Sequence, residues 1–325
     1  MSPHWRPSAS PAALRARAAM LAALRDFFAR AGVMEVETPI ASRSAGSDPA
    51  VDSLVTRWHW GSDVAGQPLY LHTSPEFPMK RLVAAGLGPI YQICKVFRDG
   101  ERGRFHHPEF SLLEWYRPGW DYLRLMDEVA ALVRVVLGRP DLSAERITYR
   151  GLFREQLGID PWTVGCAELR TRAAALAIPD AAALDLDRDG WLDLLLTQCL
   201  QGPLGRGRLT FLCDYPPSQA ALARLRQDEV DVAERFELYF DGVELANGFQ
   251  ELTDAVAQRA RLQSDLETRC DLGRATPPID TAFLAALAAG MPETAGVALG
   301  LDRLLMAVLE VRHIDEVLAF PVERA

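Results

Sequence analysis

Residues 235–249 read RFELYFDGVELANGF, in which two runs of alternating apolar and polar residues flank Asp241-Gly242. An Asp-Gly pair in that setting predicts a two-residue type I′ turn and therefore an antiparallel β-hairpin. The turn also predicts which residues face each other across the two strands: Phe240 and Val243, Tyr239 and Glu244, Glu237 and Ala246. Any fold of this chain must then contain an antiparallel sheet that includes this hairpin.

Glu237 and Glu244 share one face of the predicted hairpin, diagonally across the ladder and ~6–8 Å apart. Two carboxylates at that spacing suit Mg²⁺ bound partly through the phosphates of a nucleotide. The alternative is a solvated strand face with two unrelated glutamates. By simple alternation Glu251 lies on the other face, and it joins the pair only if Asn247-Gly248 forms a β-bulge.

The rest of the chain alternates between helix and strand patterns. Apolar residues recur every three or four positions over 12–31, which predicts an amphipathic helix ending at Gly32. Further strands are expected at 89–98 and 109–117, further helices at 75–86 and 121–138, and a helical insert at about 140–207. The sequence predicts one α+β domain over residues 1–325, with a mainly antiparallel sheet flanked by helices.

Composition narrows the class of protein. The net charge is −9, which argues against a broad nucleic-acid-binding surface, because such surfaces are normally basic. No apolar run approaches the length of a membrane span, and the five cysteines show no paired spacing. A reduced, cytoplasmic enzyme without a membrane partner is expected.

Residues 97–118 read FRDGERGRFHHPEFSLLEWYRP, a second predicted hairpin. Its loop carries Arg98, Arg102 and Arg104 opposite the carboxylates of Glu109 and Glu114. Such a mixture suits an anionic phosphate bound beside a cationic amine. A surface hairpin is the alternative.

Residues 296–309 read GVALGLDRLLMAVL, a strand, a glycine turn and a helix. Gly300 would let the backbone approach a ligand closely, and Arg303 projects from the first turn of the helix. A cation there is unfavourable for the helix dipole, which indicates an anionic partner. The alternative is a glycine turn with a surface arginine.

Three of these segments, taken in order, resemble the three motifs of class II aminoacyl-tRNA synthetases: the helix and strand ending at Pro39, the arginine-bearing hairpin, and the Gly-x-Asp-Arg strand and helix. The stretches SPEFPMKRLVAAG, FRDGERGRFHHPEFSLLEWY, GVELANGFQELTD and GVALGLDRLLM are similar to the catalytic domain of lysyl-tRNA synthetases. Those enzymes carry an anticodon-binding domain before this region, and none is expected here. The chain resembles instead the stand-alone paralogues that attach (R)-β-lysine to elongation factor P.

The resemblance implies an activity. Lysine or β-lysine would be activated with ATP and Mg²⁺ as an aminoacyl-adenylate and transferred to a lysine side chain of translation elongation factor P. A homodimer built on the first motif is implied, and tRNA is not the expected substrate. Two alternatives stay open: a truncated synthetase acting on the tRNA acceptor stem, and a catalytically inactive regulatory paralogue.

The resemblance also implies roles at the ATP site. Arg98 would grip the α-phosphate and the substrate carboxylate, Phe110 would stack on adenine, and Arg303 would lie behind the γ-phosphate. Glu237 and Glu244 match the magnesium-binding pair. The implied ATP-binding residues are Arg98, Asp99, Gly100, His107, Phe110, Glu244, Leu245, Gly300 and Arg303, with Arg98 and Arg303 as the catalytic residues.

At the amino acid site, Glu251 and Tyr116 match residues that hold the terminal ammonium of the substrate. The implied substrate-binding residues are Ser74, Pro75, Glu76, Glu114, Tyr116, Glu251 and Ala298. Of these, Glu76 and Glu114 match the residues near the other amine. Ser74 and Ala298 stand where the synthetases usually have Ala and Gly, and their bulk would favour a β-amine.

Three positions in the second motif, Asp99, Gly100 and His107, depart from the family pattern. Asp99-Gly100 replaces the usual Asn-Glu and removes a glutamate expected at the adenine amino group, which Glu101 would supply only if the loop shifts. His107 replaces an asparagine that contacts ATP, so ATP binding is expected to weaken while the phosphate contacts remain. For His106 and His107, a loop role bonded to solvent or backbone is the alternative to a ligand role.

Overall fold

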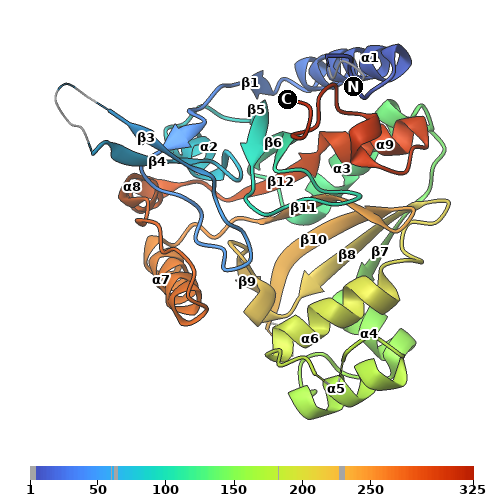
Figure 1. Cartoon of the computed structure of the whole chain (residues 1–325). Helices are drawn as coiled ribbons and strands as arrows, with labels where there is room; N and C mark the ends of the chain where they lie inside the picture. Colours follow the sequence, from blue (N-terminus) through green and yellow to red (C-terminus); the bar gives the residue numbers. More distant parts are fainter. Residues whose placement is uncertain (1–4, 60, 62–64, 182, 227–230) are drawn as a thin grey trace. The chain divides into compact units, whose positions relative to one another are not determined.

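A computed structural model of the chain describes residues 5–59, 61, 65–181, 183–226 and 231–325 (Figure 1). The chain divides into two compact units, residues 1–139 with 251–325, and residues 140–250. Each unit combines helices with mainly antiparallel strands, which confirms the predicted α+β class. Within the described part of the chain, no helix is long and apolar enough to cross a membrane.

The first unit is built on a sheet with the strand order β1-β5-β6-β12. The strands are β1 (Met34–Glu35), β5 (Ile90–Phe97), β6 (Glu109–Pro118) and β12 (Thr294–Gly300). β1 pairs with β5 in parallel, whereas β5 with β6 and β6 with β12 are antiparallel. A separate small sheet has the order β2-β4-β3, formed by Ala41–Ser42, Gln67–Leu71 and Val55–Trp58.

Helices pack against this first sheet in two groups. One group is α1 (Pro11–Arg30), α3 (Tyr122–Leu137) and α9 (Leu301–Leu309), which contact one another, with α3 against β12 and α9 against β6. The other is α2 (Glu76–Ala84), α8 (Thr281–Gly290) and α7 (Ala255–Asp271), while a short turn at Ile314–Glu316 contacts α9 of the first group. In this second group α8 contacts both α2 and α7, and α2 also lies against β6. Their close neighbourhood is visible in Figure 1.

The predicted first helix is confirmed. Ser10 caps α1 by accepting a hydrogen bond from the backbone N–H of Ala13 (3.1 Å). Its apolar face is buried through Phe28, which stacks on Tyr91 (ring centroids 4.3 Å apart) and meets Trp115 edge-on. The strand expected to end at Pro39 is shorter than predicted, because only the two residues of β1 pair with β5.

The second unit is built on a sheet with the strand order β11-β10-β8-β7 and β9 beside β10. Its strands are β7 (Ala144–Thr148), β8 (Leu209–Tyr215), β9 (Leu225–Arg226), β10 (Val232–Phe240) and β11 (Val243–Gln250). Its helices are α4 (Tyr149–Leu157), α5 (Cys166–Ala175) and α6 (Arg188–Leu195), which runs on into a wide turn at Leu196–Leu200; a short turn lies at Pro217–Gln219. Apolar side chains of these helices and of β8 form one core around Phe153, Trp191 and Leu212.

The insert predicted at about 140–207 is not purely helical. Its first element is β7, which pairs in parallel with β8 from Ala144–Leu209 to Thr148–Cys213. Residues 144–148 alternate in exposure, as a strand with one face covered does. Helices α4, α5 and α6 make up much of the remaining insert (Figure 1).

The predicted β10–β11 hairpin is present, and part of its register is corrected. Asp241 and Gly242 both have positive φ (+48° and +75°), as a type I′ turn requires. The pairs Phe240–Val243 and Tyr239–Glu244 are confirmed. The third predicted pair is wrong: Glu237 faces Asn247, and Leu238 faces Ala246. An irregularity in the ladder leaves Leu245 without a facing residue in this register, so the bulge lies there and not at Asn247-Gly248.

Candidate functional site

A buried cluster of carboxylates lies in the first unit, where β6 runs between β5 and β12. Glu114 and Tyr116 are two residues apart on β6 and therefore point to the same face. Their partners on β12 are Ala298 and Gly296. Glu251 is held beside them because its backbone N–H donates to the carbonyl of Thr294, the first residue of β12 (2.9 Å). Glu114, Tyr116 and Glu251 are each 2% exposed.

Glu114 is fixed at both oxygens. The hydroxyl of Ser74 donates to Oε2 and that of Tyr116 donates to Oε1, each at 2.6 Å. Ser74 also accepts a hydrogen bond from the backbone N–H of Glu76 (3.0 Å), which sets the first turn of α2 after Pro75. The predicted substrate residues Ser74, Glu76, Glu114 and Tyr116 are thus linked in one network, with Ala298 beside Glu114 across the sheet.

Lys80 completes this cluster and was missed by sequence reasoning. Its Nζ lies 2.6 Å from Oε1 of Glu76, one turn earlier on α2, and 2.5 Å from Oε2 of Glu251. The side chain is fully buried. A signal was available in the sequence, because among 35 lysines and arginines only Lys80 and Lys95 are lysines.

Burial perturbs the protonation of the cluster. Burial, reinforced by the nearby charge of Glu76, raises the pKa of Glu114 to about 7. Burial likewise raises the pKa of Glu251 to about 8, although the ammonium of Lys80 opposes the shift. Burial lowers the pKa of Lys80, but the facing carboxylates of Glu251 and Glu76 outweigh it, so the net shift is upward.

Gly296 leaves the space that Glu251 and Tyr116 occupy. A Cβ at this position would collide with Oε1 of Glu251 and would lie 2.5 Å from Cε1 of Tyr116. Sequence reasoning gave Gly296 no role, because the need for a glycine arises from residues that are distant along the chain. Ala298, two residues later on the same face of β12, is the nearest position to Glu114 that carries a side chain in this register.

Arg98 lies at the end of the β5–β6 hairpin with its guanidinium 5.0 Å from the ring centroid of Phe110. Its Nη1 lies 3.6 Å from Oε1 of Glu101, a long contact. Its buried Nε has no hydrogen-bond partner among the residues that the structure describes. A buried donor of this kind is costly unless a ligand satisfies it, so Arg98 is suited to bind an anion.

The loop after Arg98 explains one departure from the family pattern. Gly100 has a φ of +75°, in the left-handed region that a glutamate would adopt only with strain. Its backbone N–H donates to Oδ1 of Asp99 (2.9 Å), and the N–H of Asp99 donates to the carbonyl of Asp52 (2.8 Å). The conformation of this loop therefore favours the glycine found there.

Arg303 is bound to the hairpin loop. Its Nε donates to the carbonyl of Phe105 (3.3 Å), and its Nη2 lies 2.8 Å from Nε2 of His106. Because a guanidinium only donates, Nε2 of His106 is the acceptor and the imidazole is neutral. Burial and the charge of Arg303 lower the pKa of His106. Gly300, just before, has a φ of −74°, which other residues adopt equally well.

His107 is buried and bonded to the backbone at both ring nitrogens. Nδ1 donates to the carbonyl of Glu109 (2.5 Å), and Nε2 accepts from the N–H of Val322 (2.9 Å). A neutral imidazole with the proton on Nδ1 satisfies both bonds. These contacts favour the backbone-bonded alternative for His107 over direct contact with ATP.

Asp302, next to Arg303, has a structural role that the sequence did not indicate. It is 1% exposed and accepts hydrogen bonds from the backbone N–H of Ser111 (2.7 Å) and from Arg17 of α1. Arg17 also donates to the carbonyl of Val317 (3.0 Å). Asp302 therefore anchors the start of α9 to β6 and α1.

The predicted metal pair lies in the second unit. Glu237 is held by Nη2 of Arg235 (2.5 Å at Oε1) and by the hydroxyl of Tyr239 (2.6 Å at Oε2). Arg235 also donates to the side chain of Asn247 (3.1 Å). Glu237, Glu244 and other neighbouring groups raise the pKa of Arg235 despite its burial. The cation that two close carboxylates require is thus partly supplied by Arg235, a residue missed by sequence reasoning.

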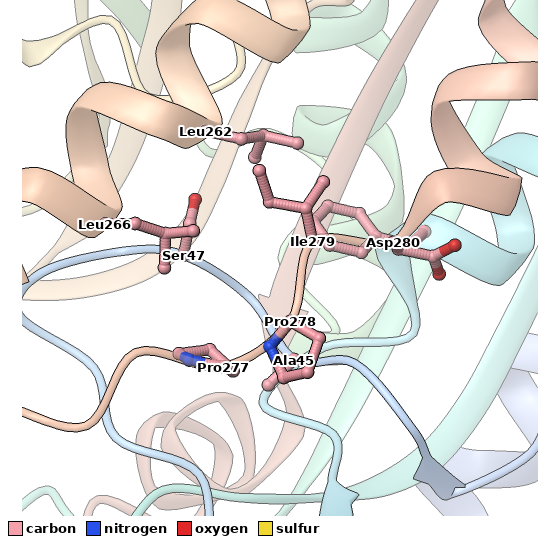
Figure 2. Close-up of a pocket in the computed structure, with 9 residues that line it drawn as sticks. Ala45, Ser47, Leu262, Leu266, Pro277, Pro278, Ile279 and Asp280 are labelled. Atoms are coloured by element: carbon pink, nitrogen blue, oxygen red, sulfur yellow. The ribbon is translucent and has the colours of Figure 1, made fainter.

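A small hollow in the first unit is lined by residues other than those of the carboxylate cluster. Leu262 and Leu266 of α7 face Ile279 and Pro278 across it (Figure 2). Asp280 at its rim caps α8 by accepting a hydrogen bond from the N–H of Phe283 (2.9 Å). This largely apolar lining does not suit a nucleotide or a diamino acid, so we take the cluster around Glu114 as the candidate site.

Comparison with known proteins fits this geometry. Residues 4–324 match the family of class II tRNA synthetases (D, K and N), and the chain belongs to that family. It is similar to curated proteins named "Elongation factor P--(R)-beta-lysine ligase". The one from Pectobacterium atrosepticum is 47% identical over 321 residues, covering 99% of this chain and 98% of its own. Those from Erwinia tasmaniensis (48% over 320 residues, 98% of each chain) and Photobacterium profundum (45% over 325 residues, 100% of each) are similar throughout.

Proposed function

We propose that this protein is an ATP-dependent ligase that activates (R)-β-lysine, or lysine, and transfers it to a lysine side chain of translation elongation factor P. The names of relatives at 45–48% identity over nearly the whole chain support this activity. The observation that carries it is the cluster of buried Glu114, Glu251 and Lys80 with the partly exposed Glu76. When its carboxylates are ionised it has two net negative charges, which a substrate with two ammonium groups neutralises.

The proposed reaction has two steps. A carboxylate oxygen of the amino acid attacks the α-phosphorus of ATP, forming the acyl-phosphate bond of an aminoacyl-adenylate and releasing pyrophosphate. The amine of the acceptor lysine then attacks the acyl carbon, an amide bond forms, the amine loses a proton, and AMP leaves. Charge neutralisation and positioning account for catalysis, without a covalent enzyme intermediate.

Each side chain at the ATP site has a proposed part. Arg98 holds the α-phosphate and the substrate carboxylate, and its buried Nε, which lacks a partner among the described residues, supports this assignment. Phe110 stacks on adenine and Arg303 binds the γ-phosphate. Asp99, Gly100, Leu245 and Gly300 contribute backbone around ATP, and Leu245 is the residue that the bulge removes from the ladder. We assign His107 a supporting role in the loop.

Glu237 and Glu244 suit a magnesium ion that accompanies ATP. The described residues include no group of three or more acidic, histidine or cysteine side chains that could hold a metal ion alone. Two carboxylates are the usual protein share when nucleotide phosphates and water supply the remaining oxygen ligands. Glu237 keeps further lone pairs for such a ligand while it accepts from Arg235 and Tyr239. The ion would neutralise phosphate charge during adenylate formation.

Substrate choice is proposed to depend on Ser74 and Ala298. Both lie next to Glu114, Ser74 through a hydrogen bond and Ala298 through strand pairing. Their bulk beside the amine would shift it away from the α-position and favour β-lysine. We also propose a cytoplasmic homodimer with one catalytic domain per chain and elongation factor P, not tRNA, as acceptor.

ATP–pyrophosphate exchange tests the activation step. The purified protein should exchange pyrophosphate into ATP only with an added diamino acid, and more efficiently with (R)-β-lysine than with α-lysine. A clear preference for α-lysine would remove the specificity proposed for Ser74 and Ala298. Absence of exchange with both amino acids would favour the inactive regulatory paralogue.

A further inference from the structure

Lys80 has no part in the two reaction steps, yet its ammonium lies at the centre of the carboxylate cluster. It contacts Glu76 at 2.6 Å and Glu251 at 2.5 Å. Nζ also lies 5.8 Å from the ring centroid of Phe283 on α8. A fully buried lysine is rare, because its charge loses hydration, and it persists only where carboxylates compensate that loss.

Lys80 contacts carboxylates that are proposed to bind both ends of the substrate. Glu251 is the carboxylate proposed for the terminal ammonium, and Glu76 is one of those proposed for the other amine. Lys80 bridges these two carboxylates. Its ammonium therefore fixes the separation between the acceptors for the two substrate ammonium groups.

When all its carboxylates are ionised, the cluster needs a third cation besides the substrate's two. Three ionised carboxylates at Glu76, Glu114 and Glu251 exceed the two ammonium groups of a diamino acid by one negative charge. Lys80 supplies the missing positive charge. If substrate displaced Lys80, the lysine would be left buried without its partners, which is energetically unfavourable.

A lysine suits this place better than an arginine. An ammonium is compact and donates in three directions, whereas a guanidinium is a wide planar fork. The chain uses arginine for nearly all its cations, and Lys95, the other lysine, is half exposed, 3.6 Å from Glu109. Lys80 is thus set apart both by its residue type and by its burial.

We infer that Lys80 is a positioning residue for the diamino acid. Its buried ammonium holds Glu76 and Glu251 in place, remains in the site when the substrate binds, and leaves one net negative charge for each substrate ammonium. This inference rests on the proposed function. A purely structural lysine would instead tie α2 to the Glu251 segment without affecting amino acid affinity selectively.

The test measures KM for the amino acid and for ATP separately, by pyrophosphate exchange. The variants are Lys80→Met, Lys80→Gln and Lys80→Ala, and the matched control is Lys95→Met, the same change at the other lysine. Lys80→Met should raise the amino acid KM about 100-fold and change the ATP KM less than about twofold. Lys95→Met should change neither.

Rescue with small molecules separates charge from packing. Propylammonium should lower the amino acid KM of Lys80→Ala by about tenfold or more, because it restores a buried cation, whereas propanol should not. If Lys80→Met fails to fold, the rescue of Lys80→Ala and the KM values of Lys80→Gln still test the inference. The inference is overturned if propanol rescues as well as propylammonium does. It is also overturned if Lys80→Gln and Lys80→Ala have the same amino acid KM as the unchanged protein.

The unchanged protein is assayed first, so that failure of the proposed function can be distinguished from failure of the role inferred for Lys80. If it shows no exchange with either amino acid, the proposed function fails and not merely the role of Lys80. If it shows exchange and the Lys80 variants raise both KM values equally, the proposed function stands and the positioning role is overturned.

Discussion

The guanidinium of Arg303 donates to Nε2 of His106 at 2.8 Å, so the third motif is bound directly to the loop of the second. This bond exists only while the imidazole is neutral, and the pKa of His106 is lowered from its ordinary value of 6.5. Arg303 and His106 are 197 positions apart in the sequence. The orientation of the proposed γ-phosphate arginine thus depends on a titratable group.

Acid should therefore weaken ATP binding. Because folding lowers the pKa of His106, protonation of this side chain in the folded protein is unfavourable. Its free-energy cost develops as pH falls below 6.5 towards the folded pKa. We expect the KM for ATP to rise as pH decreases below about 6.5, and this rise to be absent in His106→Gln. Exchange assays between pH 5.5 and 8 would check this, and an ATP KM independent of pH in the unchanged protein would contradict it.

The KM for the amino acid should also depend on pH, but at higher pH values than the KM for ATP. Glu114 and Glu251 have pKa values raised to about 7 and about 8, and the groups facing them are Glu76, Lys80 and Tyr116. Protonated carboxyls cannot pair with ammonium groups, so the amino acid KM should fall as pH rises from 6 to 8. Substitution Glu114→Gln should raise this KM by about tenfold or more and should flatten its pH profile.

The same groups predict how stability depends on pH. Carboxyls with raised pKa stabilise the folded protein below their unfolded pKa, and this contribution is lost as pH rises through about 7 to 8. The free energy of unfolding of the ligand-free protein should therefore decrease from pH 5 to pH 8. Denaturation with urea at several pH values checks this, and added β-lysine should reduce the decrease, because it pairs with the ionised carboxylates.

Gly296→Ala should damage the amino acid site. The added Cβ would overlap Oε1 of Glu251 and crowd Tyr116, so these side chains must move or the fold must strain. We expect a loss of about 1–3 kcal/mol in the free energy of unfolding, or a large rise in the amino acid KM, or both. Gly46→Ala is the matched control, since its Cβ meets only Thr73 Oγ1 at 3.5 Å. Equal behaviour of the two variants would show that Gly296 is not needed for space.

Glu237 and Glu244 should differ when each is changed to glutamine. Glu237 accepts from both Arg235 and Tyr239, and a glutamine can offer only one acceptor atom to these two donors. Glu237→Gln should therefore lower thermal stability as well as raise the Mg²⁺ concentration needed for half-maximal exchange. Glu244→Gln should raise the Mg²⁺ requirement by about tenfold. Unchanged Mg²⁺ dependence in both variants would count against a metal-binding role.

Local patterns were sufficient to predict much of the fold. The Asp241-Gly242 turn, the first helix and the two strands around Arg98 follow from signals within a few residues, and the structure contains them. The pairing of Glu237 could not be predicted, because the bulge at Leu245 has no strong local signal. Strand β7 was also missed, since its partner β8 begins 65 positions after Ala144.

The candidate site, like the fold, was predictable only where the signal lies within a few residues of the sequence. Glu114, Tyr116 and Arg98 were predicted because strand alternation and the family motifs mark them, and their roles stay predictions. Lys80 and Gly296 were missed because their importance arises from Glu251, which is brought to them only by folding. The neutral state of His106 and the backbone bonds of His107 likewise depend on Arg303 and Val322, far along the chain.

The transfer step shows whether the acceptor is elongation factor P or tRNA. Elongation factor P and lysine tRNA are incubated together with the enzyme, ATP, Mg²⁺ and (R)-β-lysine, and both acceptors are then analysed by intact mass spectrometry. We expect elongation factor P to gain the mass of one lysyl group at a lysine side chain while the tRNA is unchanged. A mass increase on the tRNA with none on the protein would contradict it and would favour a truncated synthetase.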